Sequence, residues 1–120
     1  MRTVRSLPLF LALGLLAFAG REGNFTIRFE PKAIMQTAAQ IPFEITVLDD
    51  LKKPVAEAKV TLQIETKDGQ NVEVFKAPAV AAGVYLAKPI FRQPGQWNIL
   101  VEVHRNDESS ARSMEFSVAK

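Results

Sequence analysis

The polar side chains between residues 104 and 110 include the types that nucleophilic catalysis requires. His104 is the only histidine of the chain, and Asp107, Ser109 and Ser110 follow it. A serine nucleophile needs a histidine base and an acid that orients the histidine. The stretch 106–110, however, has the composition of an ordinary solvated turn, and the chain has no cysteine as a second nucleophile. We therefore predict that the chain is not an enzyme and has no catalytic residue.

Asp49 and Asp50 are paired carboxylates, the residue types of general acid and base catalysis. Such a pair works when its surroundings raise the pKa of one carboxyl group. No neighbouring residue in the sequence would do so. We interpret the pair as the start of a turn that ends a strand.

Thioether and imidazole groups could bind copper, because Cu(I) prefers several methionine ligands, often with histidine. The candidates are Met35, Met114 and His104, since Met1 falls in a segment that we expect to be removed. Met114 is predicted to face the core, which leaves too few ligands. We predict no metal site and no cofactor. The alternative is a weak site shared with a partner, to which His104, Met35 or the mature amino terminus contributes.

The elements that must position these side chains are β-strands, because apolar residues recur at every second position after Asn24. Asp68-Gly69 and Pro94-Gly95 supply turns between strands. Residues 33–40 are predicted to form at most one helical turn. The predicted strands cover residues 25–30, 43–47, 58–65, 72–74, 83–87, 97–104 and 113–118.

Seven alternating strands without helices predict two antiparallel sheets packed face to face. Because the chain has no cysteine, we expect an all-β, seven-stranded immunoglobulin-like sandwich without a disulfide. Trp97, the only tryptophan, is placed in the core. The predicted inward-facing side chains are Phe25, Ile27, Phe43, Ile45, Val47, Val60, Leu62, Ile64, Tyr85, Trp97, Ile99, Val101, Met114 and Phe116.

Residues 1–19 are predicted to be a cleavable secretory signal. Arg2 and Arg5 precede the apolar run 7–16, and Ala17-Phe18-Ala19 is a small-x-small cleavage site. The mature domain is then residues 20–120, periplasmic or secreted, with membrane contact only if the segment is kept as an anchor. The net charge of +2 for the whole chain comes from the two arginines of the segment. The mature chain has no basic patch for a nucleic acid partner.

Four runs of the mature chain resemble the YtkA-like domain family, which is related to the FixH proteins. In that family an acidic turn ends one strand, G-x-Y-x-A opens a later one and G-x-W precedes the penultimate strand. The resemblance covers about residues 42–118. The runs are Ile45–Asp50, Lys53–Val60, Ala82–Ala87 and Gln93–Val101.

The resemblance implies an extracytoplasmic immunoglobulin-like domain and gives no catalytic residues. Some relatives are linked to copper handling or to cytochrome oxidase assembly, and the copper-linked ones carry insertions rich in Met and Gly. The corresponding stretch here, residues 65–71, has neither Met nor His.

We therefore expect a non-enzymatic exported binding or accessory module that contacts an extracytoplasmic or membrane protein. The alternative is a metal-handling or oxidase-assembly accessory protein. Binding of cell-envelope polymers is a third hypothesis.

Overall fold

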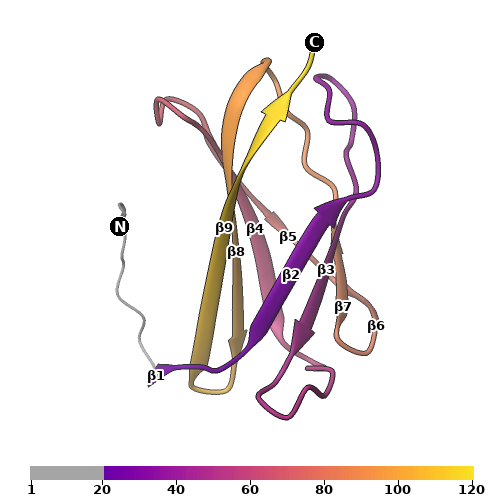
Figure 1. The fold of residues 1–120 in the computed structure, drawn as a ribbon, viewed down its shortest axis with the longest axis vertical. Helices are drawn as coiled ribbons and strands as arrows, with labels where there is room; N and C mark the ends of the chain where they lie inside the picture. Colours follow the sequence, from indigo (N-terminus) through magenta and orange to yellow (C-terminus); the bar gives the residue numbers. More distant parts are fainter. Residues whose placement is uncertain (1–20) are drawn as a thin grey trace.

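Two β-sheets packed face to face make up residues 21–120, the part of the chain that the computed structural model describes (Figure 1). The predicted signal segment, residues 1–19, lies outside these residues. The strands are β1 (Arg21–Glu22), β2 (Thr26–Pro31), β3 (Phe43–Leu48), β4 (Lys59–Thr66), β5 (Val72–Lys76), β6 (Ala79–Ala81), β7 (Val84–Ala87), β8 (Gly95–Arg105) and β9 (Glu108–Val118).

The order of the strands identifies the topology. One sheet has the order β2-β3-β7-β6, and the other has the order β1-β9-β8-β4-β5. Without β1, these are the ABED and GFCC′ orders of the immunoglobulin sandwich. Neighbouring strands are antiparallel except for β1, which pairs in parallel with β9. The predicted immunoglobulin-like sandwich is confirmed.

All seven predicted strands are present, and β1 and β6 add to them. With two and three residues, these strands are too short to show an alternation of period two. Residues 33–40, which were predicted to form at most one helical turn, contain no helix. That segment is a loop instead, and Gln36 forms an isolated parallel bridge with Ala119.

The core lies between the sheets and follows the predicted alternation. In β3 every odd-numbered residue is buried and every even-numbered residue is half-buried. Of the predicted inward set, Phe25 and Phe116 are only partly buried against the core, Met114 is exposed, and the others are buried. Buried hydrophobic residues that the prediction omitted are Phe29, Ile41, Val55, Ala77, Ala87, Phe91, Val103 and Val118.

Met114 was predicted to face the core, and this is wrong. Its register is the inward one, because it pairs with the buried Ile99. However, β9 lies near the edge of its sheet, where the opposite sheet ends at β2. The side chain of Met114 is therefore 37% exposed.

The turn between β8 and β9 also differs from the prediction. Residues 106–110 were expected to form a polar loop, but Arg105 already pairs with Glu108. The loop is therefore only Asn106 and Asp107, and Asn106 has a positive φ of 58°, which asparagine tolerates well. Ser109 and Ser110 consequently belong to β9 and are buried.

The hydroxyl group of Tyr85 fixes the loop between β3 and β4. It donates a hydrogen bond to the carbonyl of Val55 at 2.6 Å and accepts one from the N–H of Ala58 at 3.1 Å. Gly83, two residues earlier, has a φ of 73° and touches the same loop, since a Cβ atom there would lie 2.7 Å from Cβ of Pro54. The G-x-Y motif thus has a structural cause. Gly83 lets the β3–β4 loop approach the backbone closely, and Tyr85 holds the same loop through its two hydrogen bonds.

Replacing Tyr85 with Phe should lower the free energy of unfolding by about 1–3 kcal/mol, because the polar groups of Val55 and Ala58 lose their partner. The phenylalanine ring fills the same space, so the change isolates the hydroxyl group. Equilibrium unfolding in urea measures the effect. An unchanged midpoint would contradict a structural role for the hydroxyl group.

Candidate functional site

The structure brings His104 and Ser109 together across the β8–β9 hairpin. Nδ1 of His104 and Oγ of Ser109 are 2.9 Å apart. The pair therefore has the separation of a base and its nucleophile. Asp107, the third predicted member, lies in the two-residue turn between the two strands.

The surroundings of the two serines favour a structural role. Ser109 is only 5% exposed, and its carbonyl accepts a hydrogen bond from the N–H of Gly23 at 2.6 Å. Oγ of Ser110 accepts one from the N–H of Phe25 at 3.3 Å. Both serines thus hold residues 23–25 against β9.

Asp49 begins the turn after β3, as predicted. Its Oδ1 atom accepts hydrogen bonds from the N–H groups of Leu51 and Lys53, both at 2.9 Å. The bond from Lys53 is the main cause that lowers the pKa of the Asp49 carboxyl. This is opposite to the shift that a general acid needs at neutral pH.

The candidate copper ligands are spread along β9 rather than gathered. His104 contacts Ser109 near the beginning of the strand, whereas the carbonyl of Met35 accepts a hydrogen bond from the N–H of Ala119 beyond its end. Ten residues of strand span about 34 Å. Within residues 21–120, no group of three or more His, Cys, Asp or Glu side chains could hold a metal ion.

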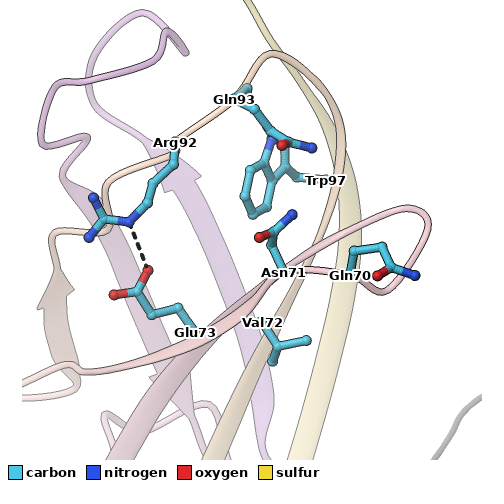
Figure 2. Close-up of a pocket in the computed structure, with 7 residues that line it drawn as sticks. All are labelled: Gln70, Asn71, Val72, Glu73, Arg92, Gln93 and Trp97. Atoms are coloured by element: carbon cyan, nitrogen blue, oxygen red, sulfur yellow. Dashed lines mark hydrogen bonds and ion pairs between the residues drawn. The ribbon is translucent and has the colours of Figure 1, made fainter.

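A cleft of about 240 Å³ lies between the β4–β5 turn and the loop that precedes β8 (Figure 2). It is open to solvent, and polar side chains predominate in its lining. The lining residues are Gln70, Asn71, Val72, Glu73, Arg92, Gln93 and Trp97.

The first wall of the cleft is a turn whose backbone is bonded internally. The carboxylate of Asp68 accepts hydrogen bonds from the hydroxyl of Thr66 at 2.7 Å and the N–H of Gln70 at 3.0 Å. The N–H of Asn71 donates to Oγ1 of Thr66 at 3.1 Å. Gly69 supplies the positive φ of 76° that the Asp-Gly pair predicted. The amide side chain of Asn71 points toward Trp97 in the cleft, and Gln70 lies beside it on the turn (Figure 2).

The second wall is anchored by Trp97. Its side chain is 2% exposed, and its ring meets that of Phe91 edge to face at 5.1 Å. The indole N–H donates a hydrogen bond to the carbonyl of Gln93 at 2.9 Å, which fixes the loop to the core. The predicted core position of Trp97 is confirmed, and the residue also lines the cleft.

One ion pair bridges the walls. Nε of Arg92 lies 3.7 Å from Oε1 of Glu73, and the two side chains are 69% and 43% exposed. The cleft thus combines balanced charge with amide donors and acceptors, beside the exposed Val72 and Val74 of β5. Sequence reasoning missed this site because amides, a valine and one ion pair carry no distinctive spacing.

Two carboxylates near this turn have pKa values shifted in opposite directions. Partial burial on β4 raises the pKa of Glu65. The N–H of Gln70, and then the hydroxyl of Thr66, lower the pKa of Asp68. A raised pKa in the folded protein means that ionised Glu65 opposes folding once the pH rises above that pKa. A lowered pKa means that ionised Asp68 stabilises the fold until the pH falls through it.

We expect Glu65→Gln to raise the melting temperature at about pH 7 and Asp68→Asn to lower it. Both differences should shrink at about pH 3, where carboxyl groups become protonated. Thermal unfolding at the two pH values measures this. A melting temperature of Glu65→Gln at or below that of the parent at neutral pH would contradict the burial of this carboxylate.

The part of the chain that the structure describes contains no helix that is long and apolar enough to cross a membrane.

Comparison with known proteins gives one family and a recurrent fold. A family model described as YtkA-like matches residues 20–102. A DUF4426 family protein from Pseudomonas aeruginosa PAO1 has a similar structure, with a TM-score of 0.56 and 17% identity over 82% of this chain and 94% of that one. No curated protein is detectably similar in sequence.

A second structure is larger. A DUF4785 family protein from Legionella pneumophila subsp. pneumophila str. Philadelphia 1 has a TM-score of 0.58 and 13% identity, over 80% of this chain and 28% of that one. This chain therefore spans less than a third of that protein. At these identities, both likenesses concern the fold alone.

Proposed function

The chain belongs to the YtkA-like family, and we propose that it is a non-enzymatic binding or accessory module that acts through protein–protein contacts outside the cytoplasmic membrane. The cleft beside β5 carries this proposal. Its partner is an extracytoplasmic or membrane protein. The proposal includes export, with cleavage after Ala19 and a mature domain that begins at Gly20.

The chemistry of the cleft suits a polypeptide. The amides of Gln70 and Asn71 each offer a donor and an acceptor, as a peptide backbone requires. Val72 and Val74 are 54% and 57% exposed on the adjoining strand. An apolar patch beside convergent polar groups is typical of a protein interface, in which aliphatic contacts supply affinity and hydrogen bonds supply register.

Replacing Val74 with Glu should abolish capture of the partner, because it places a charge in the apolar part of the interface. The matched control is Val80→Glu on β6 of the other sheet, where the parent side chain is 58% exposed. The measurement is co-purification from the extracytoplasmic fraction with tagged parent and variant proteins. N-terminal sequencing of the same material tests cleavage at Gly20.

Val74→Glu should lose the partner, and Val80→Glu should keep it. If neither variant loses the partner, the cleft is not the interface. If the tagged parent captures no partner at all, the proposed function fails.

The copper-handling alternative rests on the family resemblance, and the spread of His104, Met35 and Met114 along β9 weighs against it. We expect calorimetric titration of the exported protein with Cu(I) to show no tight stoichiometric site, because too few soft ligands meet. His104→Gln serves as the comparison variant, since it retains a hydrogen-bonding side chain. A tight site in the parent that is lost in His104→Gln would establish the alternative.

A further inference from the structure

Strand β9 has a hydrogen-bonding edge that other segments of residues 21–120 occupy only at its two ends. Backbone N–H and C=O groups point alternately toward and away from a neighbouring strand. The carbonyl of Ser109 accepts from Gly23 at 2.6 Å, and Ala119 accepts from Thr37 and donates to Met35, both at 2.9 Å. Odd-numbered residues of β9 therefore direct these groups away from β8.

Between these two ends, no strand of the described part of the chain pairs with the edge. Ala111, Ser113, Glu115 and Ser117 direct their backbone groups outward, and within residues 21–120 no backbone hydrogen bond reaches them from that side. This open stretch, residues 111–117, is called the β9 slot. Figure 1 shows β9 as one of the two long strands of its sheet, with β1 at its lower end.

The other sheet edges are blunted, which makes the β9 slot an exception. Proteins protect exposed edges with short strands, charged residues and proline. Strand β2 ends in Pro31, and β5 and β6 have five and three residues with Pro78 between them. Strand β9 has 11 residues and no proline.

The side of the β9 slot that faces the sandwich is apolar. Met114 is 37% exposed there, and Phe116 is partly buried against the core. Nη1 of Arg112 donates a hydrogen bond to the carbonyl of Ile27 on β2 at 2.8 Å, so one bond joins the two sheets at this side. A strand added beside β9 would cover Met114 and Phe116 with its inward-facing side chains.

We propose that the β9 slot binds an extended segment of a partner protein by strand addition. This inference rests on the proposed function. It adds a second contact between the domain and its partner, and it specifies that the bound partner segment is extended. The segment is about five to seven residues long, has apolar side chains at alternate positions and contains no proline.

The length of the slot excludes the β9 strand of a second copy. The stretch from residue 111 to residue 117 spans about 20 Å, whereas a strand of 11 residues spans about 34 Å between its end residues. Residues 21–23 and 35–37 occupy the two ends of the edge. A paired second β9 would run into both segments.

The test follows amide hydrogen exchange by NMR in the full chain as it is purified after expression. The probe is a capped heptapeptide of alternating valine and threonine, added up to millimolar concentration. The amides of Ala111, Ser113, Glu115 and Ser117 should exchange quickly without the probe and at least about tenfold more slowly with it. Those of Arg112, Met114 and Phe116, which face β8, should exchange slowly throughout.

Ser113→Pro removes one outward N–H without breaking the ladder to β8 and should abolish the protection. Lys76→Pro is the matched control. The N–H of Ala77 bonds to Val60 on β4, so Lys76, one residue earlier, directs its own N–H away from β4. This variant should keep the effect of the probe on β9.

Three results would overturn the inference: no slowing at the four amides, slowing that persists in Ser113→Pro, or protection of the four amides before the probe is added. The last result would mean that residues 1–20 or a second copy already occupy the edge. Any of these results, together with partner loss in Val74→Glu, would leave the proposed function standing. Slowing by the probe without any captured partner would support the slot and contradict the proposed function.

Discussion

Contact between the inner faces of the two sheets is the constraint on which the rest of the structure depends. The chain has no cysteine, so a disulfide cannot hold the sheets together as it does in many exported domains of this size. Each fully buried large apolar side chain contributes about 1.5–3 kcal/mol. The aromatic rings of Phe29, Phe43, Phe91, Phe116 and Trp97 link the sheets near one end of the sandwich.

The same packing of the two sheets determines where the cleft and the β9 slot lie. Trp97 is buried in the core, and its indole N–H donates a hydrogen bond to the carbonyl of Gln93 in the loop before β8. The burial of Trp97 therefore fixes the position of this loop, which forms one wall of the cleft. The other wall is a turn that satisfies its own backbone. The β9 slot has a related origin, since the opposite sheet ends beside it and leaves Met114 partly uncovered.

The alternation of side chains was sufficient to predict the sandwich, because a period of two determines which face of each strand is buried. It failed where burial depends on neighbours distant in sequence. Met114 has the inward parity but lies at an edge, and Phe91 is buried from a loop that has no period. Ser109 and Ser110 look like turn residues, yet the tight turn at Asn106 places them in a strand. The cleft and the slot depend on pairing between segments, which no local pattern encodes.

The internally bonded turn at the cleft has a consequence for how such a domain can diversify. Thr66, Asp68 and Gly69 maintain its shape, whereas the side chains of Gln70 and Asn71 make none of the bonds that hold it. The two adjacent positions can therefore be exchanged for other residues at little cost to folding. After a gene duplication, substitutions at Gln70 and Asn71 could change which partner one copy of the domain binds, while the fold of that copy stays the same.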